Sequence, residues 1–419
     1  MLVVPYTVGP ASPLQIAEAC DGRTDFVFLV HEQDAQATPL VPMLEELAPV
    51  VSHGGNASRV VEELAPLKPR GVVTFAEPTM RIAAAVAEAF GLPYNSQATC
   101  ELLTSKLRQR ERLNTAGVGR VRTFAFRLDD AESVSLPAGA RYPAIIKPEE
   151  GVASRNTVFV ASESDLPARL REIPPGRTYV FEEYIRGADI YGADWLADYV
   201  SVESAVAGGV IRHLGVSARL PLVAPFREGG LVFPMPPEEK TAASITDLAE
   251  RAITATGITT GLVHTEIKMS PDGPQIIEVN GRLGGTMSRL IPRALGLDPV
   301  RLAVDIALGV PLPRDFGKPS RVAMLVYVQA PMEATAVEAT PSAARLRALP
   351  GVFGVDFFAR SGRPVDWRSG SLGRICDVWI DAESPEQLRE RYRAVLDVLD
   401  SGIAWSRAKA PTRDEKPAE

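Results

Sequence analysis

Residues 261–285 read GLVHTEIKMSPDGPQIIEVNGRLGG, and this stretch decides the fold of the chain. Two strand-like runs flank the turn residues SPDG, which predicts a β-hairpin. Because side chains alternate between the two faces of a strand, one face of the first strand carries His264, Glu266 and Lys268. The other face carries Val263, Thr265, Ile267 and Met269. The hairpin is therefore expected to have one charged face and one apolar face.

The second strand of the hairpin continues this pattern. Alternation places Ile276, Glu278 and Asn280 on the charged face, with Arg282 following in step and with Ile277 and Val279 on the other face. With the turn centred near Asp272, Glu266 lies directly across from Glu278, and their Cβ atoms are about 5 Å apart. A slip of one residue would place Glu278 among apolar side chains, so the pattern favours this register.

Two facing carboxylates repel each other unless a cation lies between them or one of them is protonated. Glu266, Glu278 and Asn280 offer only hard oxygen ligands, which suit Mg²⁺ or Mn²⁺ better than zinc. A solvated strand face with ion pairs among Lys268, Arg282 and the glutamates is the alternative reading of the same spacing. Arg282 and the nearby glycines favour the metal, because a guanidinium and a tight backbone loop are what a phosphate-bearing substrate needs.

The sequence on both sides of the hairpin divides into several α/β regions. The first hundred residues alternate short apolar strands with helices, which predicts a parallel, Rossmann-like unit, and no GxGxxG follows the first strand. A charged surface helix is expected over 104–117, a small α+β lobe over 141–185, antiparallel strands over 190–233 and a helix over 238–256. The Pro- and Gly-rich segment 309–320 marks the last boundary, before three strands, a helix over 385–399 and a polar tail.

The composition is that of an ordinary globular protein, with 419 residues, 46% of them hydrophobic and 23% charged. A net charge of −7 gives no general attraction to nucleic acid or to an anionic membrane. The three cysteines are far apart, which suits a reducing compartment, and neither a signal peptide nor a membrane span is expected. The sequence therefore predicts a cytoplasmic protein whose partners are small molecules.

The hairpin resembles the catalytic hairpin of the ATP-grasp carboxylate–amine ligases, whose pattern is H-x-E, a turn, and then E-x-N-x-R-x-G-G. Upstream, a lysine in TSKLRQRERL, the dipeptide Lys147–Pro148 and FEEYIRGAD follow in the order of that family. The resemblance implies an N-terminal pre-ATP-grasp domain (1–95) and an ATP-grasp domain (96–315), with an ATP-binding lobe at about 120–188 and a catalytic metal lobe at about 189–315. A C-terminal α+β subdomain (316–405) and a disordered tail (406–419) would follow.

The resemblance also implies the parts that individual residues play. Lys106 and Lys147 would neutralise the nucleotide phosphates, and the Ser154 hydroxyl would donate a hydrogen bond to them. Glu182, with its neighbour Glu183, and the Ile185 backbone would contact adenine. Asp189 would bind the ribose. Metal ions would be held by Glu266, Glu278 and Asn280. Arg282 would stabilise the transferring phosphoryl group, with Gly284, Gly285 and Arg219 beside the substrate. His264 either orients Glu266 or acts as an acid–base group, and the first role is favoured.

Three positions depart from the family pattern. The phosphate-covering loop EEGVASRNT contains Gly151 as its one glycine, which implies lower mobility than in a glycine-rich loop. The ribose position holds Asp189 where Glu is common, and Ser105 stands where Asp usually precedes the lysine. None of these changes removes an expected metal ligand.

The implied activity is that of an ADP-forming ligase with ATP and Mg²⁺ or Mn²⁺ as cofactors. A carboxylate would be activated as an acyl phosphate and joined to an amine, as in the L-amino-acid ligases. Carboxyphosphate chemistry, as in purine biosynthesis or biotin carboxylase, is one alternative, and a non-catalytic ATP-binding regulatory module is another. The C-terminal subdomain would supply either a wall of the substrate pocket or the surface of a homodimer.

Overall fold

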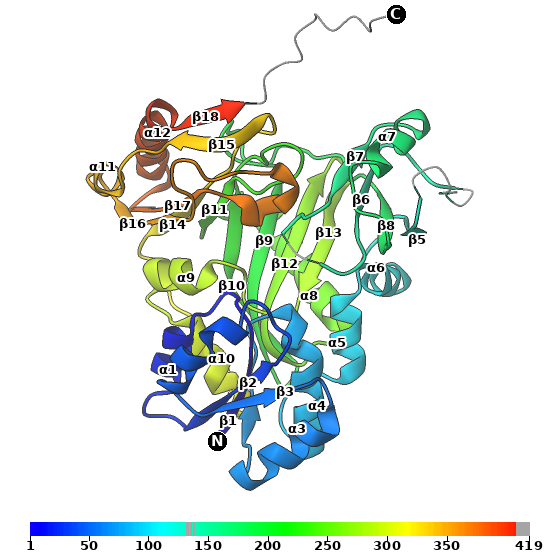
Figure 1. Cartoon of the computed structure of the whole chain (residues 1–419), viewed down its shortest axis with the longest axis vertical. Coiled ribbons are helices and arrows are strands. Elements are labelled where there is room, and N and C mark those ends of the chain that lie inside the picture. Colours follow the sequence, from blue (N-terminus) through cyan, green and yellow to red (C-terminus); the bar gives the residue numbers. More distant parts are fainter. Residues whose placement is uncertain (131–133, 135, 137–138, 152, 408–419) are drawn as a thin grey trace, which may run out of the picture.

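The computed structural model describes residues 1–130, 134, 136, 139–151 and 153–407 (Figure 1). The N-terminal domain is a parallel four-stranded sheet in the order β3-β2-β1-β4, which confirms the parallel α/β prediction. Its strands are β1 (Leu2–Tyr6), β2 (Phe26–His31), β3 (Val50–His53) and β4 (Gly71–Val72). Its helices are α1 (Pro13–Cys20), α2 (Val41–Glu45), α3 (Ala57–Leu64) and α4 (Met80–Phe90), with short 3-10 turns η1 (Thr38–Leu40), η2 (Ala65–Leu67) and η3 (Glu77–Thr79).

Two helices, α5 (Gln97–Thr104) and α6 (Lys106–Thr115), lead from this domain into a small antiparallel lobe. The order of strands in the lobe is β5-β8-β6-β7. The lobe contains β5 (Thr123–Leu128), β6 (Ala144–Pro148), β7 (Val158–Val160), η4 (Glu163–Asp165), α7 (Leu166–Leu170) and β8 (Arg177–Glu183). The sequence pattern predicted β6, β7, α7 and β8 and missed β5, which completes the sheet by pairing with β8.

The largest sheet has eight strands in the order β13-β12-β9-β10-β11-β14-β17-β16, all paired antiparallel. Its first five strands are β9 (Tyr199–Ala207), β10 (Val210–Arg219), β11 (Gly230–Phe233), β12 (Thr260–Ser270) and β13 (Gly273–Asn280). The other three, β14 (Val322–Val328), β16 (Val352–Phe357) and β17 (Cys376–Ala382), come from the C-terminal region. The sequence boundary at 316 therefore does not separate two sheets, because β14 pairs directly with β11.

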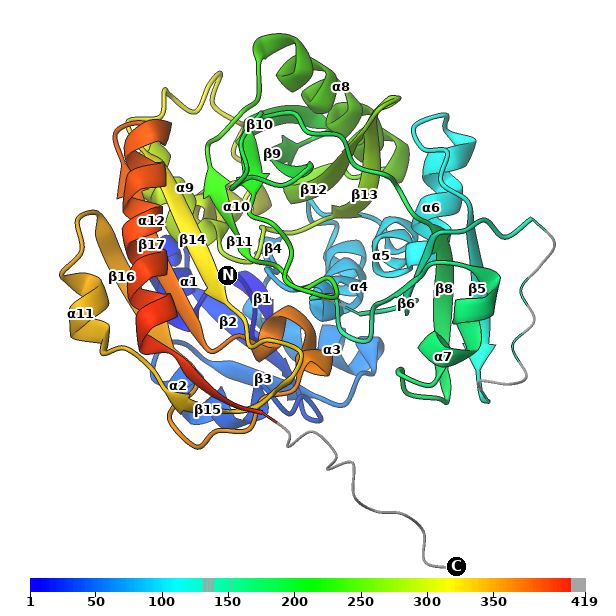
Figure 2. The same ribbon diagram turned by 90° about the horizontal axis from the view of Figure 1, so that it is seen from above.

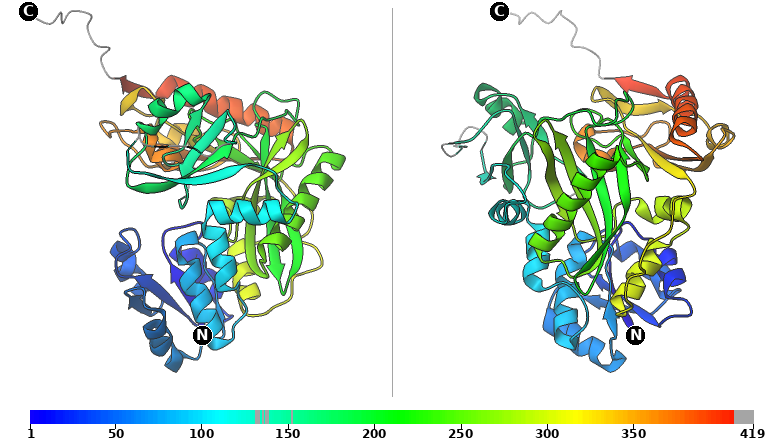
Figure 3. Two further views of the ribbon diagram at one scale, coloured as in Figure 1. Left: turned by 90° about the vertical axis from the view of Figure 1, so that its right-hand side faces the viewer. Right: turned by 180° about the vertical axis from the view of Figure 1, so that it is seen from behind.

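Helices cover this sheet and close the C-terminal region. The view from behind in Figure 3 shows α8 (Glu239–Thr256) lying across one face of the sheet. The remaining elements are α9 (Met287–Leu295), α10 (Pro299–Ala307), β15 (Ala334–Ala339), α11 (Ala343–Arg347), η5 (Trp367–Gly373), α12 (Pro385–Gly402) and β18 (Ala404–Arg407). Two residues assigned to the tail, Ser406 and Arg407, belong to β18, and the rest of the tail lies outside the described residues. No helix within the described ranges is both long and apolar enough to cross a bilayer.

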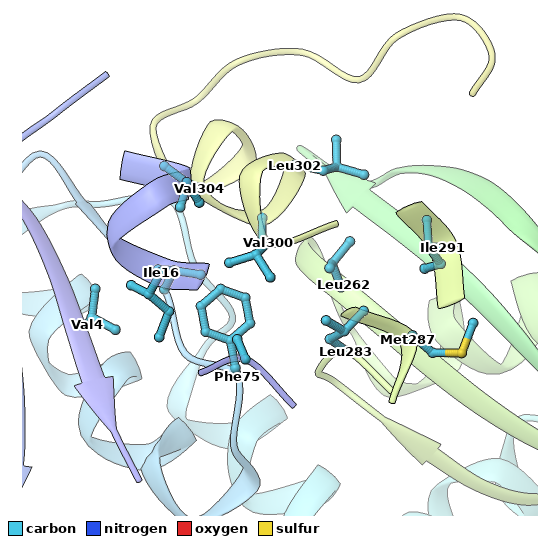
Figure 4. Packing of buried hydrophobic residues seen from close by; sticks show 14 of the residues in the cluster. Val4, Ile16, Phe75, Leu262, Leu283, Met287, Ile291, Val300, Leu302 and Val304 are labelled. Atoms are coloured by element: carbon cyan, nitrogen blue, oxygen red, sulfur yellow. The ribbon is translucent and has the colours of Figure 1, made fainter. Parts of the chain in front are cut away.

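One apolar core joins the N-terminal domain to the large sheet (Figure 4). Val4 and Ile16 of the N-terminal domain belong to the same buried cluster as Leu262 of β12 and Val300 of α10. Burial of such side chains contributes roughly 1.5–3 kcal/mol each, so this interface holds the two parts in one arrangement. It fixes the end of β4, and η3 just after it, beside the hairpin of β12 and β13.

Candidate active site

The hairpin of β12 and β13 has the register that the sequence predicts, with Glu266 opposite Glu278 and His264 opposite Asn280. A bulge follows Glu266, because Ile267 pairs with Ile276 and leaves Ile277 as the extra residue. The placement of Ile276 on the charged face was therefore wrong, and this side chain is buried in the core beneath the sheet. The bulge lets Ile276 and Val279 share the apolar face while Glu278 keeps its place on the charged one.

Glu266 is held by two cationic neighbours on the charged face. Arg219, at the end of β10, donates from Nη2 to Glu266 Oε1 at 3.1 Å and from Nη1 to Glu228 Oε1 at 2.8 Å. The Nε2 atom of His264 lies 3.3 Å from the same Glu266 oxygen and 3.0 Å from Arg219 Nη2. Both contacts of Glu266 use Oε1, so its other oxygen is left for a further ligand.

His264 is fixed from behind by a carboxylate that the sequence analysis missed. Glu203 of β9 is 2% exposed, and its Oε1 lies 2.7 Å from His264 Nδ1. Gly284 closes over this pair, because a Cβ atom at this position would lie 2.7 Å from His264 Nδ1 and 3.1 Å from Glu203 Oε2. These contacts hold the ring against Glu266, as expected of a side chain that orients its neighbour.

The charges in this network follow from the contacts. Burial alone would lower the pKa of His264, but the charge of Glu203 and the hydrogen bonds to both glutamates raise it to about 9. Burial would likewise raise the pKa of Glu266, but the hydrogen bond from His264 and the charge of Arg219 lower it to about 2. The glutamates therefore favour the protonated form of His264, which Arg219 opposes, while His264 and Arg219 favour the charged form of Glu266.

Glu278, on the other strand of the hairpin, faces a second cluster. Lys106, the first residue of α6, lies with its Nζ atom 3.6 Å from Glu278 Oε1 and donates to the Gly151 carbonyl at 2.6 Å. Glu77 in η3 brings a carboxylate from the N-terminal domain, and its Oε2 atom is buried without a hydrogen-bond partner among the described residues. Burial and the charge of Glu278 raise the pKa of Glu77 to about 7, although Arg282 and Lys106 oppose the shift.

A third cluster surrounds Lys147 at the end of β6. Its Nζ atom lies 2.6 Å from Glu182 Oε2, and Arg110 of α6 binds the other oxygen of Glu182. Burial alone would raise the pKa of Glu182, but Arg110 and Lys147 lower it to about 2. Arg110 also donates to the carbonyls of Ile276 at 2.6 Å and Ile277 at 2.8 Å. The expectation of a merely solvated helix over 104–117 was wrong on this side, because Arg110 is 4% exposed.

The structure places the remaining predicted nucleotide-binding residues in the small lobe and in the segment that follows β8. Ser154 lies in the loop between β6 and β7 with a φ angle of 54°, while Glu183 and Ile185 are half-buried at and after the end of β8. Asp189 is exposed, and its Oδ1 accepts hydrogen bonds from the backbone of Tyr191 and Gly192, both at 2.9 Å. Their contacts with a nucleotide stay predictions.

The C-terminal region lines the far side of the charged face. Glu228, already bonded to Arg219, donates from its backbone N–H to Ser371 Oγ in η5 at 2.9 Å. Arg374 packs against the ring of Tyr327, with 4.8 Å between its guanidinium carbon and the ring centroid, and pairs with Asp377 at 2.6 Å. This region therefore contacts the Arg219–Glu228 pair, and its part in a substrate pocket or a homodimer stays a prediction.

The donor set of the hairpin fits a hard divalent cation. Glu266 and Glu278 face each other across adjacent strands, and Asn280 adds an amide oxygen that lies 3.5 Å from Arg282 Nη2. In the part of the chain that the structure describes, no group of three or more His, Cys, Asp or Glu side chains is arranged around one point as a complete metal cage. Two carboxylates and one amide leave room for water and phosphate oxygens, which Mg²⁺ usually keeps in its coordination shell.

Four residues of this site were missed by sequence reasoning, for different reasons. Glu203 and Glu228 lie in strand and loop segments without a motif, and Glu77 comes from another domain. Arg110 stands in the polar run KLRQRERLNT, and its burial beside Gln109 and Leu113 became visible only in the structure.

Residues 121–286, from just before β5 of the small lobe to the residue before α9, match the family model of the ATP-grasp domain. These residues form an ATP-grasp domain. Among curated proteins, the chain is 25% identical over 344 residues to the uncharacterized protein y4rH of Sinorhizobium fredii, covering 80% of this chain and 68% of that protein. It is 27% identical over 280 residues to carnosine synthase 1 of Gallus gallus, covering 61% of this chain and 29% of that longer protein.

Solved structures share the fold over nearly the whole chain. The L-amino acid ligase from Bacillus licheniformis superposes with a TM-score of 0.75 at 22% identity, covering 97% of this chain and 98% of that one. Carboxyaminoimidazole ribonucleotide synthase from Aspergillus clavatus, complexed with ATP, gives a TM-score of 0.72 at 13% identity, covering 96% and 98%. At these identities the likeness establishes the ATP-grasp architecture, with the N-terminal α/β domain and the C-terminal region included.

Proposed function

We propose that the protein is an ATP-dependent, ADP-forming ligase that activates a carboxylate as an acyl phosphate and joins it to an amine, with two amino acids as substrates. The observation that carries this proposal is the facing pair Glu266 and Glu278, approached by Arg219 on one side and Lys106 on the other. Facing carboxylates with flanking cations suit phosphoryl transfer, which depends on charge neutralisation and positioning rather than on a nucleophilic side chain.

The nucleotide would lie between the small lobe and the hairpin. Lys106 and Lys147 bind its phosphates, the Ser154 hydroxyl donates to them, and Glu182 and Glu183 with the Ile185 backbone flank adenine near Asp189 and the ribose. The contact of Glu182 with Lys147 supports a further role for Glu182, because it holds the ammonium group at the end of β6. Glu266, Glu278 and Asn280 would hold Mg²⁺ or Mn²⁺, which neutralises phosphate charge and orients the triphosphate.

In the first step, an oxygen of the substrate carboxylate attacks the γ-phosphorus, an O–P bond forms, and the bond to the bridging oxygen breaks to release ADP. Arg282 stabilises the charge on the transferring group, and His264 keeps Glu266 in place. In the second step, the neutral amine nitrogen attacks the acyl carbon, the bond from the acyl carbon to the phosphate oxygen breaks, and the departing phosphate takes up the proton that the amine gives up. Closure of the lobe excludes water, because hydrolysis of the acyl phosphate competes with the amine.

The mixture of charges beside the hairpin supports zwitterionic substrates. Arg219 already binds the carboxylates of Glu228 and Glu266, and the backbone at Gly285 is open to a substrate, because a Cβ atom there would meet nothing within 4 Å. The Glu228 carboxylate pairs with Arg219 on one side of the hairpin, and the Glu77 carboxylate lies near Glu278 on the other. A site for bicarbonate and a nucleotide would need mainly cations here.

The test is phosphate release from ATP, with and without Mg²⁺, across a matrix of single and paired amino acids, with mass spectrometry of the products. Release that requires two amino acids, with a product lighter than their sum by one water, supports the proposal. Bicarbonate-stimulated release without an amino acid would refute it in favour of carboxyphosphate chemistry. ATP binding without turnover under any of these conditions would refute catalysis.

Variants of the hairpin make the test specific. Glu278→Gln is expected to lower turnover on the order of 100-fold, the size typical of losing one preorganised charged group in a transition state. Asp272→Asn is the matched control, because it makes the same carboxyl-to-amide change on the same hairpin at a side chain that is 78% exposed in the turn.

A further inference from the structure

The loop between β6 and β7 has an unusual backbone for a chain segment that contains almost no glycine. Ala153, Ser154 and Asn156 have φ angles of 60°, 54° and 53°, in the left-handed region that residues with a side chain rarely adopt. Each such residue costs on the order of 1 kcal/mol and persists only when its surroundings hold it. A partner for this loop is therefore expected within the fold.

That partner is η5 of the C-terminal region. Ser371 donates from its backbone N–H to the Ala153 carbonyl at 2.9 Å. Gly370 has a φ of 66°, and a Cβ atom at this position would overlap Ala153 O and lie 2.9 Å from Arg155 N. Figures 1 and 2 show the orange segment before β17 on the side of the C-terminal region that faces the lobe. Two backbones thus meet at a glycine, across more than 200 residues of sequence.

The same η5 segment also contacts the substrate side of the site. The Ser371 side chain is 3% exposed, and its Oγ accepts from the Glu228 N–H at 2.9 Å. Gln329 Nε2 donates to the carbonyls of Glu228 at 3.1 Å and Ser371 at 3.4 Å. Glu228 in turn binds Arg219, which binds Glu266. A continuous set of hydrogen bonds therefore runs from the loop to the charged face of the hairpin.

We propose that Gly370 and Ser371 are positioning residues that hold the 153–156 backbone over the nucleotide phosphates and connect it to the Arg219–Glu228 pair. This inference rests on the proposed function for its catalytic consequence and on geometry alone for the docking itself. The C-terminal region acts as the counterpart onto which the loop closes. When the loop is held, water is kept from the acyl phosphate, and ATP consumption stays tied to amide formation.

Gly370→Ala tests the docking, with Gly362→Ala as its matched control. Gly362 lies in the same region with a φ of 83°, and a Cβ atom there would meet nothing within 4 Å, so Gly362→Ala adds a side chain at a positive-φ glycine without touching the loop. Gly370→Ala crowds the loop and also strains its own backbone, because Gly370 has a φ of 66° and a ψ of −153°. Arg155 is exposed in the loop and gives trypsin a cleavage site. Mass spectrometry measures the rate of cleavage after Arg155. We expect this rate to be roughly five- to tenfold higher in Gly370→Ala than in Gly362→Ala, because losing about one hydrogen bond makes the loop open that much more often. Equal cleavage rates in the two variants would overturn the docking.

Kinetics test the catalytic consequence separately. In Gly370→Ala, the KM for ATP is expected to rise roughly five- to tenfold and phosphate release to exceed amide formation, whereas Gly362→Ala keeps one phosphate per amide. Ser371→Ala keeps the backbone bond to Ala153 but removes the acceptor for Glu228, so the KM of the acid substrate is expected to rise while cleavage at Arg155 stays unchanged. An unchanged KM would refute the link to Arg219. Faster cleavage in a protein that forms no amide would support the docking and refute the proposed function.

Discussion

The buried ion pair of Arg110 and Glu182 gives the sharpest test of how the site is held together. The side chains of Arg110 and Glu182 are 5% and 8% exposed, and Arg110 also donates to two carbonyls at the bulge of β13. Arg110→Met removes all of these bonds and leaves Glu182 with Lys147 as its one cationic partner among the described residues. Removing one member of a buried pair costs about 3–5 kcal/mol, because the remaining charge stays buried.

The magnitude can be read as a change in the thermal midpoint. For a domain of this size, 1 kcal/mol corresponds to about 2–4 °C, so Arg110→Met is expected to lower the midpoint by about 10 °C. Arg108→Met is the control, because Arg108 lies on the same helix with its side chain 62% exposed and paired with Glu101 at 3.1 Å. Exposed pairs of this kind contribute at most about 1 kcal/mol.

A second substitution separates loss of the pair from loss of packing. The double variant Arg110→Met, Glu182→Leu removes both buried charges, so it is expected to recover part of the stability lost in Arg110→Met. Differential scanning fluorimetry of the three variants and the parent protein measures the effect. A midpoint for Arg110→Met equal to that of Arg108→Met would refute the reasoning, as would a double variant whose losses simply add.

Two further predictions concern the charged groups. Gly284→Ala is expected to lower turnover on the order of 100-fold, because the added Cβ atom would displace His264. Gly54→Ala is the control and should leave turnover within about twofold, because a Cβ atom there would come no closer than 3.7 Å to another residue. Equal turnover of the two variants in steady-state assays would contradict the close packing at Gly284. The pKa of Glu182 is about 2 in the folded protein and about 4.3 when unfolded, so its stabilising contribution of about 3 kcal/mol is present above pH 4.3 and is lost as pH falls toward 2. The midpoint difference between the parent protein and Glu182→Gln should therefore shrink from pH 6 to pH 3, and a constant difference would contradict the assignment.

The sequence alone determined the charged hairpin and the type of sheet on either side of it. Alternation with a period of two, with the turn centred near Asp272, placed Glu266 opposite Glu278, because a slip of one residue would bury a carboxylate among apolar side chains. The same reasoning predicted the parallel N-terminal sheet and the antiparallel strands after the lobe, since both depend on short-range apolar patterns. It failed locally at Ile276, because a bulge adds one residue and reverses the alternation beyond it.

The tertiary structure decided which distant residues complete the site. Glu77 reaches the hairpin only because the N-terminal domain shares a core with β12, and Arg110 meets Glu182 only because α6 packs between the lobe and β13. The C-terminal strands join the large sheet through one pairing of β11 with β14, which brings Ser371 next to both Ala153 and Glu228. These contacts join residues far apart in the chain, and local periodicity carries no information about them. They depend on how complete sheets and helices pack against one another, and this packing is determined by the tertiary structure.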